Sequence, residues 1–329
     1  MVYKIKSVPE DFVVKEIIGL KFEDSGFSYY NLKKTNLSVQ EAAEIISKKL
    51  RINKKFINYA GTKDKIAITE QKISIKNGPE RNFDFGNLKL EFLGKGKERI
   101  NLGDNLGNYF EIVVRDIDKK PEKIKSFVNY FDDQRFSDKN VEIGKAIIKR
   151  DFKKAADFIL EDKKYGEMTK EYLEKNKNDF IGALRLIDRK ILRMFVHAYQ
   201  SYLWNLCVSE NFERQKHNEI EYSLGKLNIP VEEDENPGFP IIGFGTEEDG
   251  TVEEILAREK ITRRDFIIKE IPELSSEGSE RNVFAEIKNL NISELENDEL
   301  NNGKKKVKIS FELGKGSYAT MAIKQLFFS

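Results

Sequence analysis

A helical repeat of large apolar side chains in the middle of this 329-residue chain constrains its fold more than any other feature. One such side chain stands at every fourth position: Ile187, Ile191, Phe195, Tyr199 and Leu203. This spacing predicts the buried face of a long helix, within a mainly helical stretch over residues 141–208. Both ends of the chain instead alternate with the period of two that is typical of strands. We therefore expect an α+β fold, rich in strands at both ends and helical in the middle.

Shorter signals place individual elements. Residues 3–18 alternate and are rich in β-branched side chains, which predicts two short strands broken at Pro9. Ser38 with Glu41 three positions later has the pattern of a capping box, so a helix is expected to begin there. Pro121 in "PEKIKSFVNYFDDQRF" predicts the start of another helix, which runs into an aromatic-rich loop. At the carboxyl end, the turn "GKGSYAT" is expected to join a strand to a short helix.

Composition limits the class of protein. Hydrophobic residues make up 39% of the chain and charged residues 34%, so a core is available beneath a charged surface. No apolar run approaches the 18 residues of a membrane span, and "MVYKIKSVPEDF" lacks the apolar region of a signal peptide. Cys207 is the single cysteine, which excludes an internal disulfide and fits a reducing compartment. We therefore expect a cytoplasmic protein with no membrane partner.

Charge is balanced overall but uneven along the chain. The 57 basic and 56 acidic residues give a net charge of +1. Between residues 48 and 65, however, seven bases surround a single acid, Asp64. Such a run is either a solvated face or a local electropositive patch around one carboxylate. Both interpretations stay open at the level of charge.

Several kinds of catalytic site are disfavoured. Two histidines and one cysteine cannot fill a zinc site without carboxylates, so no metal site is expected. The chain has neither a G-x-x-x-x-G-K-[ST] phosphate loop nor a G-x-S-x-G nucleophile turn. Carboxylates, lysines, amides and aromatic rings remain, and these groups suit a site that handles a nucleobase.

Six motifs appear in one order: "KSVPEDFVVKEI", "AGTKDKIAITEQ", "GNYFEIVVR", "VNYFDDQRFS", "HAYQSYLWN" and "GKGSYATMAI". Together they resemble the tRNA pseudouridine synthase D (TruD) family, and they run from Lys6 to Lys324. The resemblance implies isomerisation of uridine to pseudouridine in tRNA, typically at position 13, with no cofactor and no metal. It also implies a pseudouridine synthase catalytic domain over residues 1–150 and 273–329, with a family-specific domain inserted at residues 151–272. The implied partner is tRNA, and we expect a monomer without an obligate protein partner.

The same resemblance assigns roles to single residues. "GTKDK" places the catalytic nucleophile at Asp64, and "KSVPEDF" places a catalytic lysine at Lys6. Contacts with the uridine are implied for four further residues: Phe12, Asn129, Phe131 and Tyr318. The carbon that Asp64 attacks, C6 of the base or C1′ of the sugar, is left open.

Physical reasoning links these roles. A cation within about 4–6 Å favours an ionised carboxylate, so Lys6 is expected to form a buried ion pair with Asp64; otherwise Lys6 is a surface lysine of a strand. The basic run then forms an RNA-backbone track, with the candidates Lys54, Lys55, Lys63 and Lys65. Arg135 is expected to brace its loop through a nearby acid or to reach phosphate.

Three other interpretations compete with the synthase, and one of them is a structural protein that binds no ligand. A non-catalytic RNA-binding protein of the same fold would bind RNA without making a product. A metal-dependent nuclease would need several converging acids and would depend on Mg²⁺.

Overall fold

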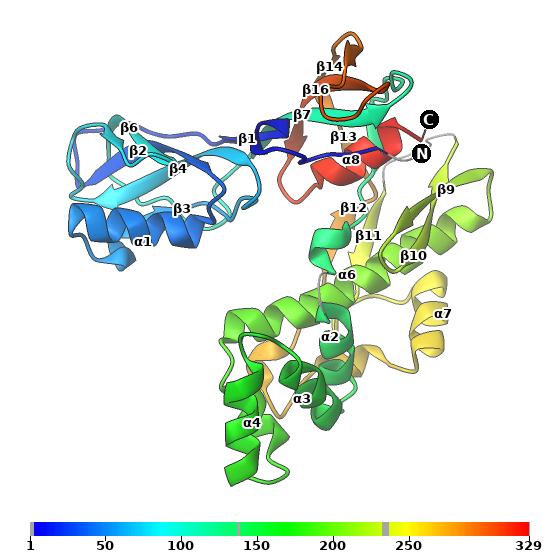
Figure 1. The fold of residues 1–329 in the computed structure, drawn as a ribbon. Coiled ribbons are helices and arrows are strands. Elements are labelled where there is room, and N and C mark those ends of the chain that lie inside the picture. The colour runs from blue at the N-terminus through cyan, green and yellow to red at the C-terminus, as the bar shows by residue number, and fades with distance from the viewer. Residues whose placement is uncertain (1–2, 137–138, 232–236, 329) are drawn as a thin grey trace. The chain divides into compact units, whose positions relative to one another are not determined.

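The computed structural model describes residues 3–136, 139–231 and 237–328 (Figure 1). It divides into two compact units. The first unit contains residues 1–127 and 285–329, so it is built from both ends of the chain. The second unit is the continuous stretch 128–284. The predicted insert, residues 151–272, falls wholly inside the second unit, and its boundaries as a separate domain stay a prediction.

The first unit is built on a ten-stranded sheet with the order β14-β16-β7-β1-β4-β2-β6-β5, in which β15 also pairs with β16 and β3 with β4. Its strands are β1 (Phe12–Ile17), β2 (Phe27–Thr35), β3 (Ile57–Tyr59), β4 (Ile68–Lys76), β5 (Phe83–Asp84), β6 (Leu88–Gly96), β7 (Gly107–Ile117), β14 (Lys288–Ile292), β15 (Glu296–Asn297) and β16 (Lys305–Gly314). Strands β1 and β4 are parallel, and the other pairings in this sheet are antiparallel.

The parallel pair decides where the candidate catalytic residues meet. Val13 of β1 lies opposite Ile68 of β4, so the two strands start at the same edge of the sheet. The segment that leads into β1 carries Lys6, and the loop that leads into β4 carries Asp64. Both segments therefore lie beside one another at that edge.

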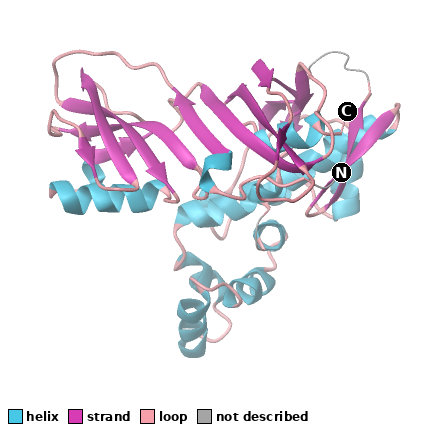
Figure 2. Cartoon of the chain, turned by 45° about the horizontal axis from the view of Figure 1, so that its top comes forward, coloured by secondary structure: helices cyan, strands magenta, loops and turns pink. Residues whose placement is uncertain are grey.

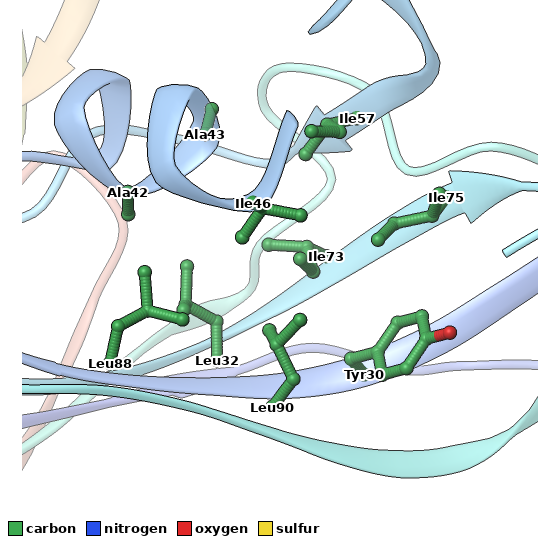
Figure 3. Close-up of a cluster of buried hydrophobic side chains, with 10 residues drawn as sticks. All are labelled: Tyr30, Leu32, Ala42, Ala43, Ile46, Ile57, Ile73, Ile75, Leu88 and Leu90. Atoms are coloured by element: carbon green, nitrogen blue, oxygen red, sulfur yellow. The ribbon is translucent and has the colours of Figure 1, made fainter. Parts of the chain in front are cut away.

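Helix α1 (Val39–Leu50) closes one face of the strands β2, β4 and β6 (Figure 2). Its start confirms the predicted capping box, because Ser38 Oγ accepts from Glu41 N and the Glu41 carboxylate accepts from Ser38 N. Ile46 of the helix packs with Leu32 and Ile73 in a cluster of buried apolar side chains (Figure 3). The second helix of this unit, α8 (Ala319–Leu326), follows β16 as expected from the sequence.

The first predicted strand is not formed. Residue Lys4 makes a single antiparallel bridge with Arg115, and the chain then leaves the extended conformation at Lys6, whose φ is +58°. Pro9 starts a 3₁₀ turn (Pro9–Asp11), and only the second strand, β1, is regular. A left-handed residue costs about 1–2 kcal/mol when it is not glycine, so the conformation of Lys6 is imposed by its surroundings.

The second unit is mainly helical. Its elements are α2 (Asn140–Ile148), α3 (Phe152–Leu160), α4 (Gly166–Lys175), α5 (Phe180–Arg185), α6 (Arg189–Glu213), β9 (His217–Tyr222), β10 (Gly225–Pro230), β11 (Gly238–Ile241), α7 (Gly250–Glu259) and β12 (Ser279–Asn282). The predicted long helix is α6, in which Phe195, Tyr199 and Leu203 are buried. Gly144 lets α2 approach it closely, since a Cβ atom there would lie 2.0 Å from the carbonyl oxygen of Phe195.

The helix predicted from Pro121 is wrong. Residues 121–125 form no helix, and the chain continues into β8 (Ser126–Val128), which pairs with β13 (Phe284–Glu286). Phe127 and Val128 are buried there, so the pairing with a strand far along the chain outweighs the local proline signal. Among the described residues, no helix has the length and apolar character that crossing a membrane requires.

Candidate active site

Asp64 lies in the loop of residues 60–67 between β3 and β4, which we call the Asp64 loop. Hydrogen bonds from three other segments fix the backbone of this loop. Gly103 N donates to Ala60 O at 2.8 Å, and Gln71 Nε2 donates to Gly61 O at 3.2 Å. The ammonium of Lys34 donates to the carbonyl oxygen of Asp64 at 3.3 Å. The carboxylate is therefore carried by a constrained turn rather than by a free loop.

Lys6 reaches the Asp64 carboxylate. The Nζ atom lies 3.4 Å from Oδ1 of Asp64 and 4.1 Å from the centre of the Phe12 ring. The expected ion pair is present, but its side chains are 20% and 28% exposed, so it is open to solvent rather than buried. The Phe12 ring beneath the ammonium directs Lys6 toward the carboxylate, because a cation is attracted to the face of an aromatic ring.

A buried arginine anchors the segment that carries Lys6. Arg115 donates to the carboxylates of Asp11 and Asp298, each at 2.9 Å, and all three residues are buried. The backbone of Arg115 also exchanges two hydrogen bonds with Lys4. Lys6 thus lies between two fixed points, Lys4 and Asp11, and this explains how its left-handed conformation is maintained.

Lys63 does not lie on a solvent-facing surface. Its Nζ atom lies 2.7 Å from Oε1 of Glu16, and the exposed fractions of the two side chains are 6% and 0%. The other oxygen of Glu16 accepts a hydrogen bond from Lys72 N. This position does not support the predicted role of Lys63 in an RNA-backbone track, because its ammonium is occupied inside the sheet. It instead secures the residue next to Asp64.

The other three candidates for RNA contact are exposed. Lys65 pairs with Glu41 and Lys54 pairs with Glu44, each at 2.7 Å. Lys55 lies over the Phe56 ring at 5.2 Å. Exposed ion pairs contribute little to stability, so these ammonium groups can exchange their partners for a phosphate at small cost.

Phe12 and Tyr318 belong to the same unit as Asp64. Phe12 is 1% exposed and packs edge-on against Phe110, so most of its ring serves the core. Tyr318 is partly buried and stands at the start of α8. The structure brings Phe12 into contact with Lys6, whereas the position of Tyr318 is set by the turn after β16.

Asn129 and Phe131 belong to the second unit, where Arg281 links them. Arg281 donates to both the backbone and the side-chain oxygen of Asn129, with Nη2 at 2.7 Å from each. Its guanidinium lies 4.2 Å from the centre of the Phe131 ring, which also meets Trp204 edge-on. Nδ2 of Asn129 makes a long bond of 3.4 Å to the carbonyl oxygen of Asn282. Arg281 therefore fixes the orientation of the Asn129 amide through its oxygen, whereas, among the described residues, the amide N–H groups form only the weak hydrogen bond to Asn282.

Arg135 braces the same loop, though through a hydroxyl rather than through the acids expected from the sequence. Its Nε donates to Ser201 Oγ of α6 at 3.0 Å, and its guanidinium lies 5.7 Å from the Phe131 ring centre. The neighbouring Asp133 accepts from Ser223 N. The loop around Phe131 is thus tied to α6 and to the turn before β10.

The model of one protein family matches nearly the whole chain. It is described as tRNA pseudouridine synthase D (TruD), and it matches residues 1–172, 163–222 and 232–326. The chain belongs to the TruD family. The predicted family is confirmed, and the predicted enzyme class is that of this family.

Individual members of the TruD family are similar to this chain along almost their full length. "Probable tRNA pseudouridine synthase D 2" of Methanocaldococcus jannaschii is 37% identical, over 98% of this chain and 91% of the relative. "tRNA pseudouridine synthase D" of Aquifex aeolicus is 31% identical, over 99% and 98%. A crystal structure from Methanosarcina mazei, named "Putative tRNA pseudouridine synthase D (TruD)", superposes with a TM-score of 0.72 at 26% identity, over 98% and 93% of the two chains. The predicted α+β fold of a pseudouridine synthase is therefore confirmed.

Three residues that support the TruD motif side chains were not found from the sequence. Lys34 left a signal, since it is a charged residue in an alternating strand at a position that faces the core, whereas Arg115 is out of phase with the buried Phe110 and Ile112 of β7 and left no such signal. Arg281 left none, because its two partners lie 150 and 152 residues earlier in the chain.

Proposed function

We propose that this chain isomerises uridine to pseudouridine in tRNA, at position 13, with Asp64 as the covalent nucleophile. The observation that carries the proposal is the contact between Lys6 and Asp64 in a chain of the TruD family. The alternative, an RNA-binding protein without activity, does not require a lysine in a strained conformation to reach this carboxylate.

The reaction exchanges one bond for another. The bond between N1 of uracil and C1′ of ribose breaks, and a bond between C5 and C1′ forms. C5 loses a proton and N1 gains one, so atoms and electrons balance without a co-reactant. A carboxylate that bonds covalently to the substrate divides this change into two easier steps. Lys6 provides positive charge beside Asp64 whenever the carboxylate is free, and so holds the nucleophile in position.

The uridine must leave its stack before it can react, which costs a few kcal/mol. Phe12, Phe131 and Tyr318 are proposed to contact the extruded nucleotide. Phe12 and Phe131 are only 1% and 7% exposed, so each can offer a nucleotide no more than the edge of its ring. They shape the site and do not provide a ring face on which a base could stack. Tyr318 is more exposed and is the better candidate for stacking.

Asn129 is proposed to recognise a uracil carbonyl. Arg281 donates to its side-chain oxygen and so directs the amide to present its N–H groups to a ligand. Uracil carries a carbonyl at C4 where cytosine carries an amino group, and a donor distinguishes the two. This orientation supports a preference for uridine.

Lys54, Lys55 and Lys65 are proposed to contact the RNA backbone from the exposed surface near α1. Such contacts give affinity that falls with salt and carry no sequence information. A monomeric state and a cytoplasmic location remain predictions from the sequence.

The test is a pseudouridine assay on unmodified tRNA transcript in buffer with EDTA. Carbodiimide labelling and primer extension map the product, and Asp64→Asn is run beside Asp84→Asn, an exposed acid of the same unit. We expect a stop at uridine 13 with the wild type and with Asp84→Asn, and none with Asp64→Asn. Binding of several tRNAs without any stop would favour the binding protein. Product from Asp64→Asn would exclude Asp64 as the nucleophile, and activity only with added Mg²⁺ would favour metal chemistry.

A further inference from the structure

Lys34 is a lysine in an unusual place. It lies near the end of β2, its side chain is 0% exposed, and its ammonium donates to two backbone carbonyl oxygens, those of Leu37 at 2.6 Å and Asp64 at 3.3 Å. Lysine is almost never fully buried unless it is paired, because removing its charge from water is costly. No carboxylate oxygen lies within 4.0 Å of Nζ among the described residues, so the two carbonyl groups are its direct partners.

The position of Lys34 is set by the sheet. It pairs directly with Thr69 on β4, so the two side chains share the face that α1 covers, at the end nearest the Asp64 loop. Tyr30 and Leu32 precede it on this face and belong to the apolar cluster. Lys34 thus stands at the end of this row of side chains, where an apolar residue would be expected. The core meets the candidate active site at this position.

Three charged groups face Lys34 from the elements packed against it. The Asp64 carboxylate and the Lys63 ammonium come from the Asp64 loop, and the Glu41 carboxylate comes from the first turn of α1. Burial lowers the pKa of Lys34 to about 8, and attraction to Asp64 is the largest effect that opposes this shift. Lys63 lowers the pKa further and Glu41 raises it.

We propose that Lys34 is a positioning residue, which ties the carbonyl group of Asp64 to β2 and places a second positive charge behind the nucleophile. Lys6 approaches the carboxylate from the solvent side, and Lys34 holds the peptide of the same residue from within the core. This role rests on the proposed function of Asp64. Lys34 is buried and would therefore affect catalysis through Asp64, without touching the substrate itself.

A dependence on pH follows. Lys34 carries its charge below about pH 8 and loses it above, whereas lysines in water keep theirs to above pH 10. Loss of the charge weakens the hydrogen bonds to both carbonyl groups, because a neutral amine is a poorer donor than an ammonium. It also removes the attraction to Asp64. The turnover number kcat should therefore fall on the alkaline side of about pH 8, while the affinity for tRNA changes little.

Three variants test the proposal through kcat measured on tRNA between pH 6 and 9.5. Lys34→Met fills the same space without charge, and we expect kcat to fall about ten- to a hundredfold with no alkaline limb remaining. Lys34→Arg keeps a charge at every pH and should move the limb above pH 9.5. Lys33→Met is the matched control, because Lys33 is half exposed on the opposite face of β2 and pairs with Glu70. It should behave as the wild type.

A second measurement does not depend on activity or on the folding of Lys34→Met. The protein labelled with ¹⁵N at lysine Nζ is titrated by NMR, as the wild type and as Asp64→Asn, with Lys34→Arg identifying the signal. We expect an Nζ that titrates near pH 8 and that titrates lower still when the Asp64 charge is removed.

The outcomes separate this role from the function on which it rests. Unchanged kcat in Lys34→Met, or a Lys34 pKa that is the same with and without the Asp64 charge, would overturn the positioning role while the synthase stands. Absence of pseudouridine from the wild type would overturn the synthase, and the catalytic role of Lys34 with it.

Discussion

The ammonium of Lys63 and the carboxylate of Glu16 lie 2.7 Å apart and are almost completely enclosed, one residue before the candidate nucleophile. This pair joins the Asp64 loop to β1, the strand that follows the Lys6 segment. Because β1 also pairs in parallel with β4, the salt bridge connects the two segments that carry Lys6 and Asp64. A lysine in a basic motif of an RNA-modifying family is here a structural residue.

Lys63→Met should destabilise the protein by about 3–5 kcal/mol, because it leaves the Glu16 carboxylate buried without its charge partner. The double variant Lys63→Met with Glu16→Gln should recover most of that loss. Chemical denaturation measures both. A loss below about 1 kcal/mol in the single variant would contradict the structural role.

Salt dependence of tRNA binding separates Lys63 from Lys65. Removing a lysine that contacts phosphate reduces the slope of log K against log salt by about one. We expect that reduction for Lys65→Met, whose ammonium is exposed, and no change for Lys63→Met. Filter binding at several salt concentrations checks this. A reduced slope in Lys63→Met would show that Lys63 leaves Glu16 for the RNA.

Lys6→Met should lower kcat about a hundredfold, since it removes both the charge and the orientation that the cation gives to Asp64. The dissociation constant for tRNA should stay within about twofold. Lys4→Met is the control, because Lys4 is an exposed lysine of the same segment that pairs with Asp116. Single-turnover kinetics measures the chemical step. Equal rates for the two variants would mean that the contact of Lys6 with Asp64 is not used.

Arg281→Lys keeps a positive charge but loses the planar fork that holds both oxygens of Asn129. We expect kcat/KM to fall about tenfold, and the effects of Arg281→Lys and Asn129→Ala to be strongly non-additive, because one residue acts through the other. Arg189→Lys, at an exposed position of α6, is the matched control. Additive effects would show that Arg281 serves only the packing of Phe131 and Trp204.

Asp298 should give the fold a marked sensitivity to acid. Burial by itself raises the pKa of this carboxyl, but it is outweighed by hydrogen bonds from Leu300 N, Asn301, Asp116 N and Arg115, so the pKa lies well below its usual range. The unfolded chain, with an ordinary Asp pKa of about 4, binds the proton first as the pH falls. The stabilisation is thus complete above about pH 5 and is lost on going below pH 4. Denaturation midpoints at pH 7, 4 and 3 should fall more steeply for the wild type than for Asp298→Asn, and parallel curves would refute this.

The sequence predicted what depends on local order. Ser38 and Glu41 cap α1 because a capping box needs only four consecutive residues. The repeat through Phe195 and Tyr199 located α6 because a helix buries every fourth residue on one face. The family motifs predicted the approach of Lys6 to Asp64, although not its exposure to solvent.

The sequence did not predict what depends on distant pairing. Arg115 and Asp298 are 183 residues apart, so no spacing rule connects them. Pro121 has the local appearance of a helix start, but the next residues gain more by pairing with β13. Lys63 and Lys65 are chemically alike and two residues apart, and only the strands around them determine which one is buried.

The place of β16 in the sheet has a consequence for how the chain folds during synthesis. Strand β7 pairs on one side with β1, which the ribosome makes before it, and on the other with β16, which the ribosome makes only after the whole of the second unit. Until β16 emerges, β7 keeps an open edge, the kind of template on which sheets of different chains join. The second unit is continuous in sequence, so all of its residues are synthesised while the edge of β7 is still unpaired. Nascent chains stalled before residue 305 should therefore be the species most dependent on chaperones. Strand β16 completes the sheet that presents Asp64.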